Sequence, residues 1–452
     1  MAGYGRIFNA QRLRRATAAS AFTVMLVSGV VPAAADTPSE SETPAADTRT
    51  SSSRPVTPEL TPGSDKPIAQ PQPEGAGGML AAGSPETCSE PNEEGTFGCF
   101  VVASGVKQPE RASEEMGAAA GVAPPQWCEQ STGTPLGNRT AVCQVNAGVY
   151  TTYKKVNNTV SVSGSANLLV INYSYGDTGI PTIAHQIDIS AYSGWGEALK
   201  GTITAKADTP TRQEEELEGV EDEDLSDCTV ESSSFPAKAI SPLNSWGTGE
   251  SFFDSNAITP GDKALCATRW NITITNGGQA PVKAAYKLKQ FRCDNATGGR
   301  PNAGCVVPWF PSLLTYSKAS APDLVRHVTL AQQSGLPGAT YEAPLKRSTN
   351  EPLNASNRSL ACGDAPSIAG KSCDEYPFAT TLNGLTNMAP RARRTFADCD
   401  LPNIPSGTTG PKAVSICMIP VADQSYQGGK NAQFYRAERM LHGDPFRVGT
   451  VA

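Results

Sequence analysis

Short runs in which apolar and polar residues alternate fill the middle of this 452-residue chain. Period-two alternation is typical of a β-strand with one buried face, and turn pairs such as Asn276-Gly277 separate the runs. The pattern predicts a mainly β, sandwich-like module over residues 87–310. The clearest predicted strands cover 141–145, 159–162, 168–173, 186–189 and 270–274.

A small α+β domain is predicted over residues 311–452, where helical and strand-like segments replace the alternating runs. Residues 321–328 have helical character, and Pro322 suits the first turn of a helix. This helix carries His327, which we expect at the helix surface or between domains.

The end of this domain predicts the order strand, loop, helix. Residues 413–421 form an apolar run typical of a buried strand, and residues 430–441 place apolar side chains at helical spacing. Between them, the two glycines of 423–429 predict a polar turn. A turn that enters a helix can present backbone amides to a phosphate group. A short final strand is expected over 444–448.

The first 35 residues have the organisation of a cleaved signal peptide. A basic stretch at 12–15 precedes an apolar run at 18–31, and three alanines at 33–35 form the cleavage site. The run is shorter than the ~20 residues that cross a bilayer, and no later stretch reaches that length. We therefore expect an exported, extracellular protein without a membrane segment. Residues 36–86, rich in Ser, Thr, Pro and Glu, are expected to be a disordered linker.

The cysteines agree with export, because their number, 12, is even and disulfides form in oxidising compartments. No Cys-x-x-Cys pair occurs and the chain has 3 histidines, so a zinc site is the weaker alternative. Spacing does not fix the connectivity, but pairing between sequence neighbours is the simplest scheme. It gives the bonds Cys88–Cys99, Cys128–Cys143, Cys228–Cys266, Cys293–Cys305, Cys362–Cys373 and Cys399–Cys417.

The net charge of −7 taken alone argues against a polyanionic partner, but the acidic residues are unevenly placed. Residues 212–228 hold nine carboxylates and one Arg, whereas residues 341–452 hold 12 Lys and Arg against 10 Asp and Glu, which is +2 by subtraction. The acidic run is interpreted as a solvated loop between strands. The alternative is that it mimics a phosphate backbone and shields a basic face.

Two adjacent carboxylates, Asp374 and Glu375, stand between Cys373 and the step Tyr376-Pro377. In an extended chain they project in different directions, so one can hold a metal ion while the other handles a proton. Pro377 biases Tyr376 away from helical geometry. Such a pair alone is usually solvated surface, and the strand–loop–helix pattern downstream favours a chemical role.

Several motifs occur in a specific order: CDEYPFA at 373–379, QGG at 427–429, FY at 434–435 and R-x-L-x-GDPF-x-V at 439–448. Together they resemble the NucA/NucB family of secreted bacterial deoxyribonucleases, in particular its long actinobacterial forms. The resemblance is strong over about residues 340–452. It implies metal-dependent, largely sequence-nonspecific hydrolysis of DNA phosphodiesters by a domain related to the ββα-metal nucleases.

The resemblance also implies roles for individual residues. Asp374 is expected to be the general base for the attacking water, and Glu375 a metal ligand or base-orienting group, with the two roles exchangeable. Mg²⁺ or Mn²⁺ is the expected cofactor, since carboxylate and amide oxygens suit hard cations. The expected downstream metal ligands or phosphate contacts are Asp423, Gln424 and Gln427. The expected phosphate-binding cations are Arg358, Lys430 and Arg436.

The chain departs from the family at Gln424, where the family commonly has an Asn. Gln keeps the amide but is one methylene longer, which puts metal affinity or activity in doubt. Two other interpretations stay open: an extracellular binding or adhesion protein with a degenerate nuclease domain, and a secreted nuclease toxin. Plasmid cleavage with and without EDTA separates an enzyme from a binder, and a neighbouring immunity gene indicates a toxin.

Overall fold

The computed structural model describes residues 68–69, 87–103, 122–131, 133–209 and 226–452. The predicted signal peptide, nearly all of the predicted linker and the acidic run up to residue 225 lie outside these residues. No helix in the described part combines the length and the apolar character needed to cross a membrane.

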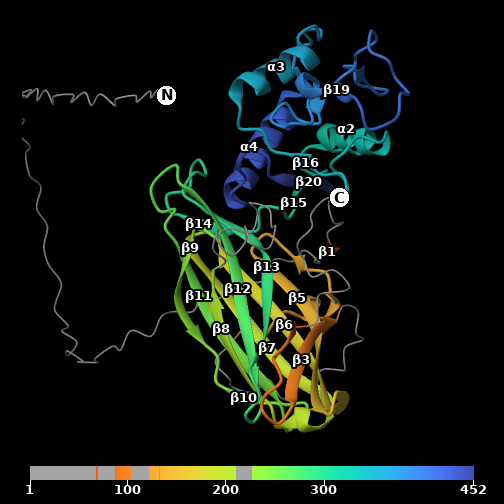
Figure 1. Ribbon diagram of the computed structural model, residues 1–452. Helices are drawn as coiled ribbons and strands as arrows, with labels where there is room; N and C mark the ends of the chain where they lie inside the picture. Colours follow the sequence, from red (N-terminus) through yellow and green to blue (C-terminus); the bar gives the residue numbers. More distant parts are fainter. Residues whose placement is uncertain (1–67, 70–86, 104–121, 132, 210–225) are drawn as a thin grey trace, which may run out of the picture. The chain divides into compact units, whose positions relative to one another are not determined.

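Long antiparallel strands dominate the first part of the described chain (Figure 1). One sheet of nine strands has the order β1-β4-β5-β6-β7-β11-β9, with β3 also paired to β5 and β2 paired to β3. Its strands are β1 Ile68–Ala69, β2 Thr87–Cys88, β3 Thr96–Ala103, β4 Leu136–Gly137, β5 Ala141–Val156, β6 Thr159–Asp177, β7 Ile180–Gly196, β9 Cys228–Ser234 and β11 Trp246–Ser255. The second sheet, in the order β10-β8-β12-β13-β14, has β8 Thr202–Asp208, β10 Lys238–Ala239, β12 Lys263–Thr275, β13 Val282–Asp294 and β14 Gly304–Val306.

These two sheets share one hydrophobic core, to which both contribute buried side chains such as Ile187, Phe253 and Trp270. The sandwich-like arrangement predicted from the alternation is therefore present. One detail was wrong, because the strands predicted at 159–162 and 168–173 are a single strand, β6. Small polar residues between them interrupt the apolar pattern, but the backbone stays extended and pairs with β5 and β7.

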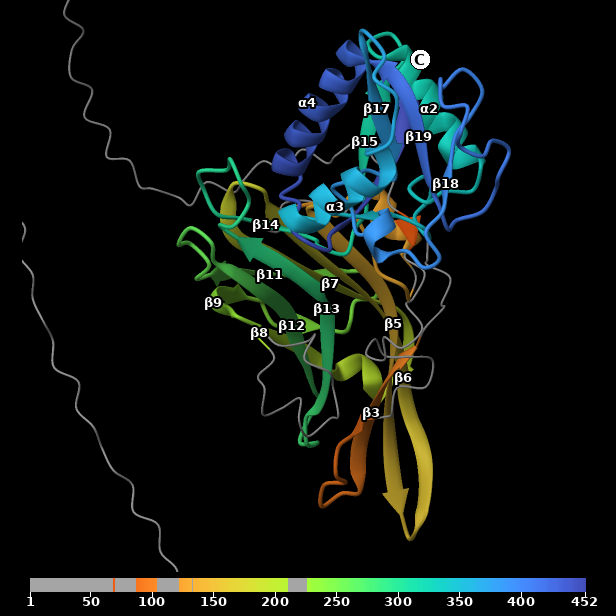
Figure 2. The ribbon, with the colours of Figure 1, turned by 90° about the horizontal axis from the view of Figure 1, so that it is seen from above.

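Two three-stranded sheets and three α-helices form the last part of the chain. The first sheet, β15-β20-β16, has β15 Ser312–Ser317, β16 Leu345–Lys346 and β20 Pro445–Val451. The second, β17-β19-β18, has β17 Lys371–Tyr376, β18 Arg393–Arg394 and β19 Val414–Pro420. The helices are α2 Pro322–Gln333, α3 Glu351–Cys362 and α4 Val421–Ala437. Helices α2 and α4 contact β17 and β19, as does α3 (Figure 2).

Helix α4 begins at Val421, directly after β19 ends at Pro420. The polar turn predicted over 423–429 is therefore wrong, and so is the predicted helix start at residue 430. Gly428 and Gly429 lie inside the helix with open space beside each Cα. Because their amides belong to the helix interior, they are not free to bind phosphate as expected.

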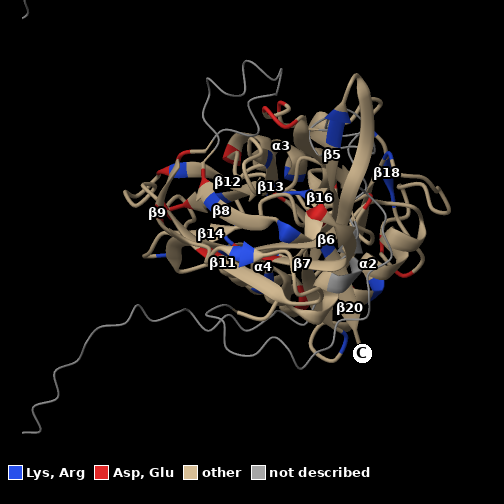
Figure 3. Ribbon diagram, turned by 60° about the horizontal axis from the view of Figure 1, so that its bottom comes forward, with Lys and Arg blue, Asp and Glu red and all other residues tan. Residues whose placement is uncertain are grey.

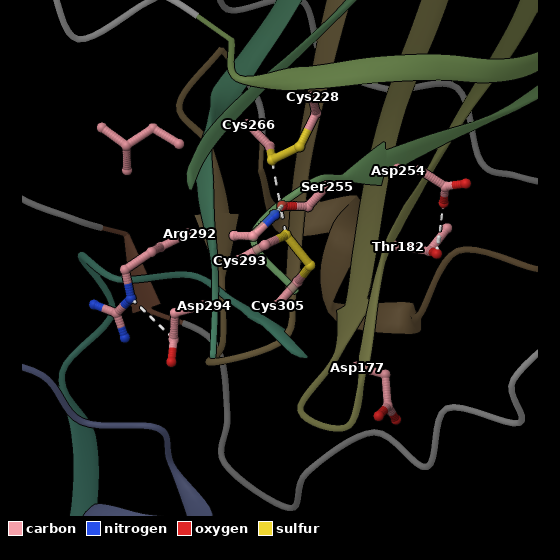
Figure 4. The surroundings of a disulfide bond; sticks show 12 residues. Asp177, Thr182, Cys228, Asp254, Ser255, Cys266, Arg292, Cys293, Asp294 and Cys305 are labelled. Carbon is pink, nitrogen blue, oxygen red and sulfur yellow. Dashed lines mark hydrogen bonds and ion pairs between the residues drawn. A yellow bond between two sulfur atoms is a disulfide. The ribbon is translucent and has the colours of Figure 1, made fainter. Parts of the chain in front are cut away.

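All six disulfides follow the predicted scheme of sequence neighbours. Two of these bonds, Cys228–Cys266 and Cys293–Cys305, lie side by side, with 3.7 Å between the Cys266 and Cys293 sulfurs (Figure 4). Three of these sulfurs are close enough to share a metal ion. Each one is bonded to another sulfur, however, so the thiolates that zinc requires are not available.

A buried network of arginines and aspartates ties the end of the chain to the strands of the β-rich module. The Asp444 carboxylate accepts hydrogen bonds from Arg139 at 2.7 Å and from Arg292 at 2.6 Å. Asp294 accepts from Arg439 at 3.1 Å, and all five side chains are almost fully buried. Arg439 and Asp444, two residues of the terminal sequence motif, therefore have a structural role in this buried network.

Removing the Asp444 carboxylate leaves Arg139 and Arg292 buried without their shared partner. We predict that Asp444→Ala lowers the free energy of unfolding in urea by about 3–5 kcal/mol, as for other broken buried ion pairs. Asp364→Ala is the matched control, since Asp364 pairs with Arg393 at the surface and its side chain is 65% exposed. It should change the stability little. Equal effects of the two variants contradict the structural role.

Candidate active site

Strand β17 presents its two adjacent acids to opposite sides of the sheet, as expected for an extended chain. Asp374 is 2% exposed, whereas Glu375 is partly exposed. Strand β17 is also an edge strand of its sheet, so only one of its two edges is hydrogen-bonded to a neighbouring strand.

Asp374 is held by a buried hydrogen-bond relay that reaches back to its own strand. His327 of α2 places Nδ1 2.6 Å from Asp374 Oδ2 and Nε2 2.9 Å from the Ser415 hydroxyl of β19. Ser415 in turn donates to the backbone carbonyl of Tyr376 at 3.2 Å. Among the described residues, the other carboxylate oxygen, Asp374 Oδ1, has no hydrogen-bond partner. One oxygen of Asp374 is thus fixed, while the other is available to a ligand.

The expectation that His327 lies at a helix surface or between domains is wrong, because its side chain is completely buried. It shares the inner face of α2 with Leu324, Val328 and Ala331. These positions follow helical spacing, so the sequence did contain a signal for burial. Its partner Asp374 lies 47 residues further along the chain, and no local pattern indicates that contact.

Glu375 lies in a strongly perturbed electrostatic environment. Burial, reinforced by the negative charge of Asp374, raises the pKa of Glu375 to about 7. The Arg358 guanidinium and the Ala379 backbone N–H oppose this shift. A buried carboxyl group beside a second acid favours a bound proton or a nearby cation.

Tyr316 of β15 lies against α4. Its ring packs against Phe378 and Tyr426, and its hydroxyl donates to the Asn431 side chain of α4. Burial raises the pKa of Tyr316 well above its ordinary value, and the charge of Asp374 raises it further. Tyr316 therefore contacts α4 and lies within the electrostatic influence of Asp374.

Two glutamines of α4 leave buried polar atoms without partners. Gln424 Nε2 donates to Gln427 Oε1 at 2.9 Å. Gln424 Oε1 and Gln427 Nε2 are buried, and neither has a partner in the described part of the chain. Buried polar atoms are nearly always paired, so each exception asks for an explanation. An unpaired amide oxygen is a suitable ligand for a hard cation.

Asp423, which we expected to bind metal, has a structural role, because it hydrogen-bonds to the start of α2. Its Oδ2 accepts hydrogen bonds from the backbone N–H groups of Asp323 at 3.0 Å and Leu324 at 3.2 Å. These are free donors in the first turn of α2, and the residue before that helix, Ala321, supplies no side-chain cap. Asp423 therefore caps α2 from a distance of about a hundred residues along the chain, which sequence patterns do not indicate.

Few protein ligands are gathered for a metal ion. In the residues that the structure describes, the one group of three His, Cys, Asp or Glu side chains with ligand atoms close together is the disulfide-bonded cysteine group. The domain thus lacks a preformed carboxylate cage in its described residues. Mg²⁺ needs no such cage, since it usually keeps several waters and takes one or two protein ligands plus substrate phosphate. Gln424 Oε1 offers one such ligand, while Glu375 lies on the face of the sheet opposite Asp374.

The three predicted phosphate-binding cations lie on two helices. Arg358 is exposed on α3, and its positive charge lowers the pKa of Glu375. The Lys430 ammonium group of α4 lies 6.0 Å from the centre of the Tyr426 ring. Arg436 is exposed near the end of α4, and its guanidinium lies against Gly299. Basic and acidic residues are interspersed over the described chain (Figure 3).

One further cation of the domain, Arg347, was not predicted. Arg347 stacks on the Tyr435 ring with its guanidinium carbon 3.8 Å from the ring centre, and it donates to the Thr380 carbonyl at 3.3 Å. Arg347 Nε is buried without a partner in the described part of the chain. Its sequence context, a lone Lys-Arg pair before a helix, carries no chemical signal.

Comparison with known proteins supports the motif analysis. Residues 329–449 match the family model of deoxyribonuclease NucA/NucB. This range includes Asp374, Glu375 and the whole of α4. No curated protein and no solved structure matches the chain.

Two substitutions distinguish a helix cap from a metal ligand at Asp423. Asp423→Asn keeps an oxygen that can accept from both N–H groups of α2, so its melting temperature in EDTA should stay near that of the wild type. Asp423→Ala removes the cap and should lower the free energy of unfolding by about 1 kcal/mol. If both variants match the wild type in EDTA but lose a Mg²⁺-dependent rise in melting temperature, Asp423 is a metal ligand instead.

Proposed function

We propose, from the premise that residues 329–449 are a NucA/NucB deoxyribonuclease domain, that this chain is a secreted, metal-dependent endonuclease. It would hydrolyse DNA phosphodiester bonds with little sequence preference. The observation that carries the proposal is the Asp374 carboxylate, which has one anchored and one available oxygen on a strand in contact with α4.

Asp374 supplies the general base. Hydrolysis of a phosphodiester needs a group that takes a proton from the attacking water, and a carboxylate held in one orientation does this efficiently. Asp374 Oδ2 is occupied by His327, so the proton goes to Oδ1. The low exposure of Asp374 keeps competing water away and strengthens its electrostatic interactions.

Gln424 would hold the metal ion, Mg²⁺ or Mn²⁺, whereas Glu375 points to the face of the sheet opposite Asp374. When bound, such an ion neutralises charge on the phosphate and on the leaving oxygen. Gln424 Oε1 is a buried amide oxygen without a partner in the described part of the chain, and its helix contacts β17. The unpaired oxygen fits a site that gains stability from a cation.

Cations on α3 and α4 would bind the DNA backbone. Arg358 and Lys430 are the proposed phosphate contacts. Contacts to phosphate position the duplex but do not read its sequence. This arrangement supports cleavage with little sequence preference.

The order of elements supports a relation to ββα-metal nucleases. Strand β17 pairs antiparallel with β19, and α4 follows β19 without a connecting loop. The base lies on the first strand and the amide ligand on the helix. The six disulfides support export to an oxidising compartment.

Cleavage of supercoiled plasmid tests the enzymatic proposal. Wild-type protein with Mg²⁺ or Mn²⁺ should nick the plasmid, and EDTA should stop the reaction. Asp374→Asn keeps the shape of the side chain but accepts no proton, so the rate should fall at least ~100-fold. Asp364→Asn, a change in an exposed carboxylate of the same domain, should leave the rate unchanged. Intact plasmid with metal-replete wild type contradicts the function, and full activity of Asp374→Asn contradicts the base.

The metal dependence of Gln424 variants tests the proposed ligand. Gln424→Ala should raise the Mg²⁺ concentration for half-maximal cleavage by about 10-fold or more, because it removes an amide oxygen that binds the ion. Gln433→Ala is the matched control, since Gln433 is exposed on the same helix. Identical Mg²⁺ titrations for the two variants contradict a role of Gln424 at the metal.

A further inference from the structure

We propose that His327 is a positioning residue of this nuclease: its hydrogen bond to Asp374 Oδ2 holds the carboxylate in one orientation. The proposal rests on the function proposed above, because His327 acts only through Asp374. It adds a part of the site that lies on α2, outside the sequence motifs.

The hydrogen-bond directions explain how the ring is fixed. The Ser415 hydroxyl has one proton and donates it to the Tyr376 carbonyl, so the Ser415 oxygen accepts from His327 Nε2–H. On the other side of the ring, Nδ1 lies at hydrogen-bond distance from Asp374 Oδ2, at 2.6 Å. Both ring nitrogens are therefore engaged, and rotation of the ring would break both bonds.

The relay closes on the strand where it starts. Ser415 and Tyr376 are directly opposite each other in the β17–β19 pair, and Asp374 lies two residues before Tyr376. His327 thus spans two neighbouring strands from one helix. This geometry makes the direction of the Asp374 carboxylate depend on the position of α2.

The same three residue types, Asp, His and Ser, also occur in hydrolases that use serine as a nucleophile, but this arrangement cannot work in that way. Ser415 is completely buried, and its hydroxyl is already donated to a backbone carbonyl. A nucleophile must be open to substrate. His327 is completely buried as well, so it does not itself meet a water or a phosphate. A positioning task remains.

Helix α2 also links the base to the proposed metal ligand. Asp423 caps the first turn of α2, and the next residue in α4 is Gln424. His327 stands about one turn further along α2. The helix therefore fixes the distance between the side chain that takes the proton and the side chain that binds the ion. A small misplacement of either group lowers the rate strongly.

Steady-state cleavage of supercoiled plasmid by the full chain, at saturating Mg²⁺ and well below each melting temperature, tests the proposal. His327→Ala removes both hydrogen bonds, so kcat should fall by about 100-fold while KM for the plasmid changes less than about 3-fold. His327→Asn keeps an N–H near the position of Nδ1 and should recover part of the lost kcat. His442→Asn is the matched control, since His442 is exposed, and it should behave as the wild type.

The outcomes separate this proposal from the function itself. If Asp374→Asn cleaves like the wild type, the general base is wrong and the positioning role falls with it. If Asp374→Asn is inactive but His327→Ala keeps the wild-type kcat, the function stands and the positioning role is overturned. If His327→Ala and His327→Asn lose equal activity, and only in proportion to the loss of folded protein measured by near-ultraviolet circular dichroism, His327 is merely structural and the proposal is overturned.

Discussion

The hydrogen bond between His327 and Asp374 is the interaction on which the rest of the site depends. A carboxylate is unstable in a protein interior unless a partner satisfies it. Strand β17 can bury Asp374 because α2 brings His327 to it, and α2 is held in turn by Asp423 of α4. A sheet, two helices and the proposed general base therefore form one connected arrangement.

Much of the fold could be predicted from local patterns in the sequence. The alternating runs indicated strands because burial on one face of a sheet repeats every two residues. The simplest scheme for the cysteines, pairing between sequence neighbours, is the pairing that the structure has, although spacing alone does not fix it. The start of α4 could not be predicted in this way. Gly428 and Gly429 suggest a turn, but the packing of α4 against β17 and β19 keeps them helical. Tertiary contacts override such local preferences.

The site was predictable only in part for the same reason. The opposite directions of Asp374 and Glu375 follow from strand geometry, so sequence reasoning found them. The partner of Asp374 and the capping role of Asp423 arise from contacts between distant segments, which a single sequence does not show. Arg439 and Asp444 belong to a motif that suggested chemistry, whereas the structure uses them in a buried ion network with Arg292.

The central claim is that β17 and α4 together form a metal-dependent site. The most direct test is a crystal of the protein soaked with Mn²⁺, with the ion located by its anomalous scattering. The account predicts a peak roughly 2.0–2.3 Å from Gln424 Oε1. A peak bound by Asp423 in place of its contacts with α2, or no Mn²⁺ near α4, would contradict it.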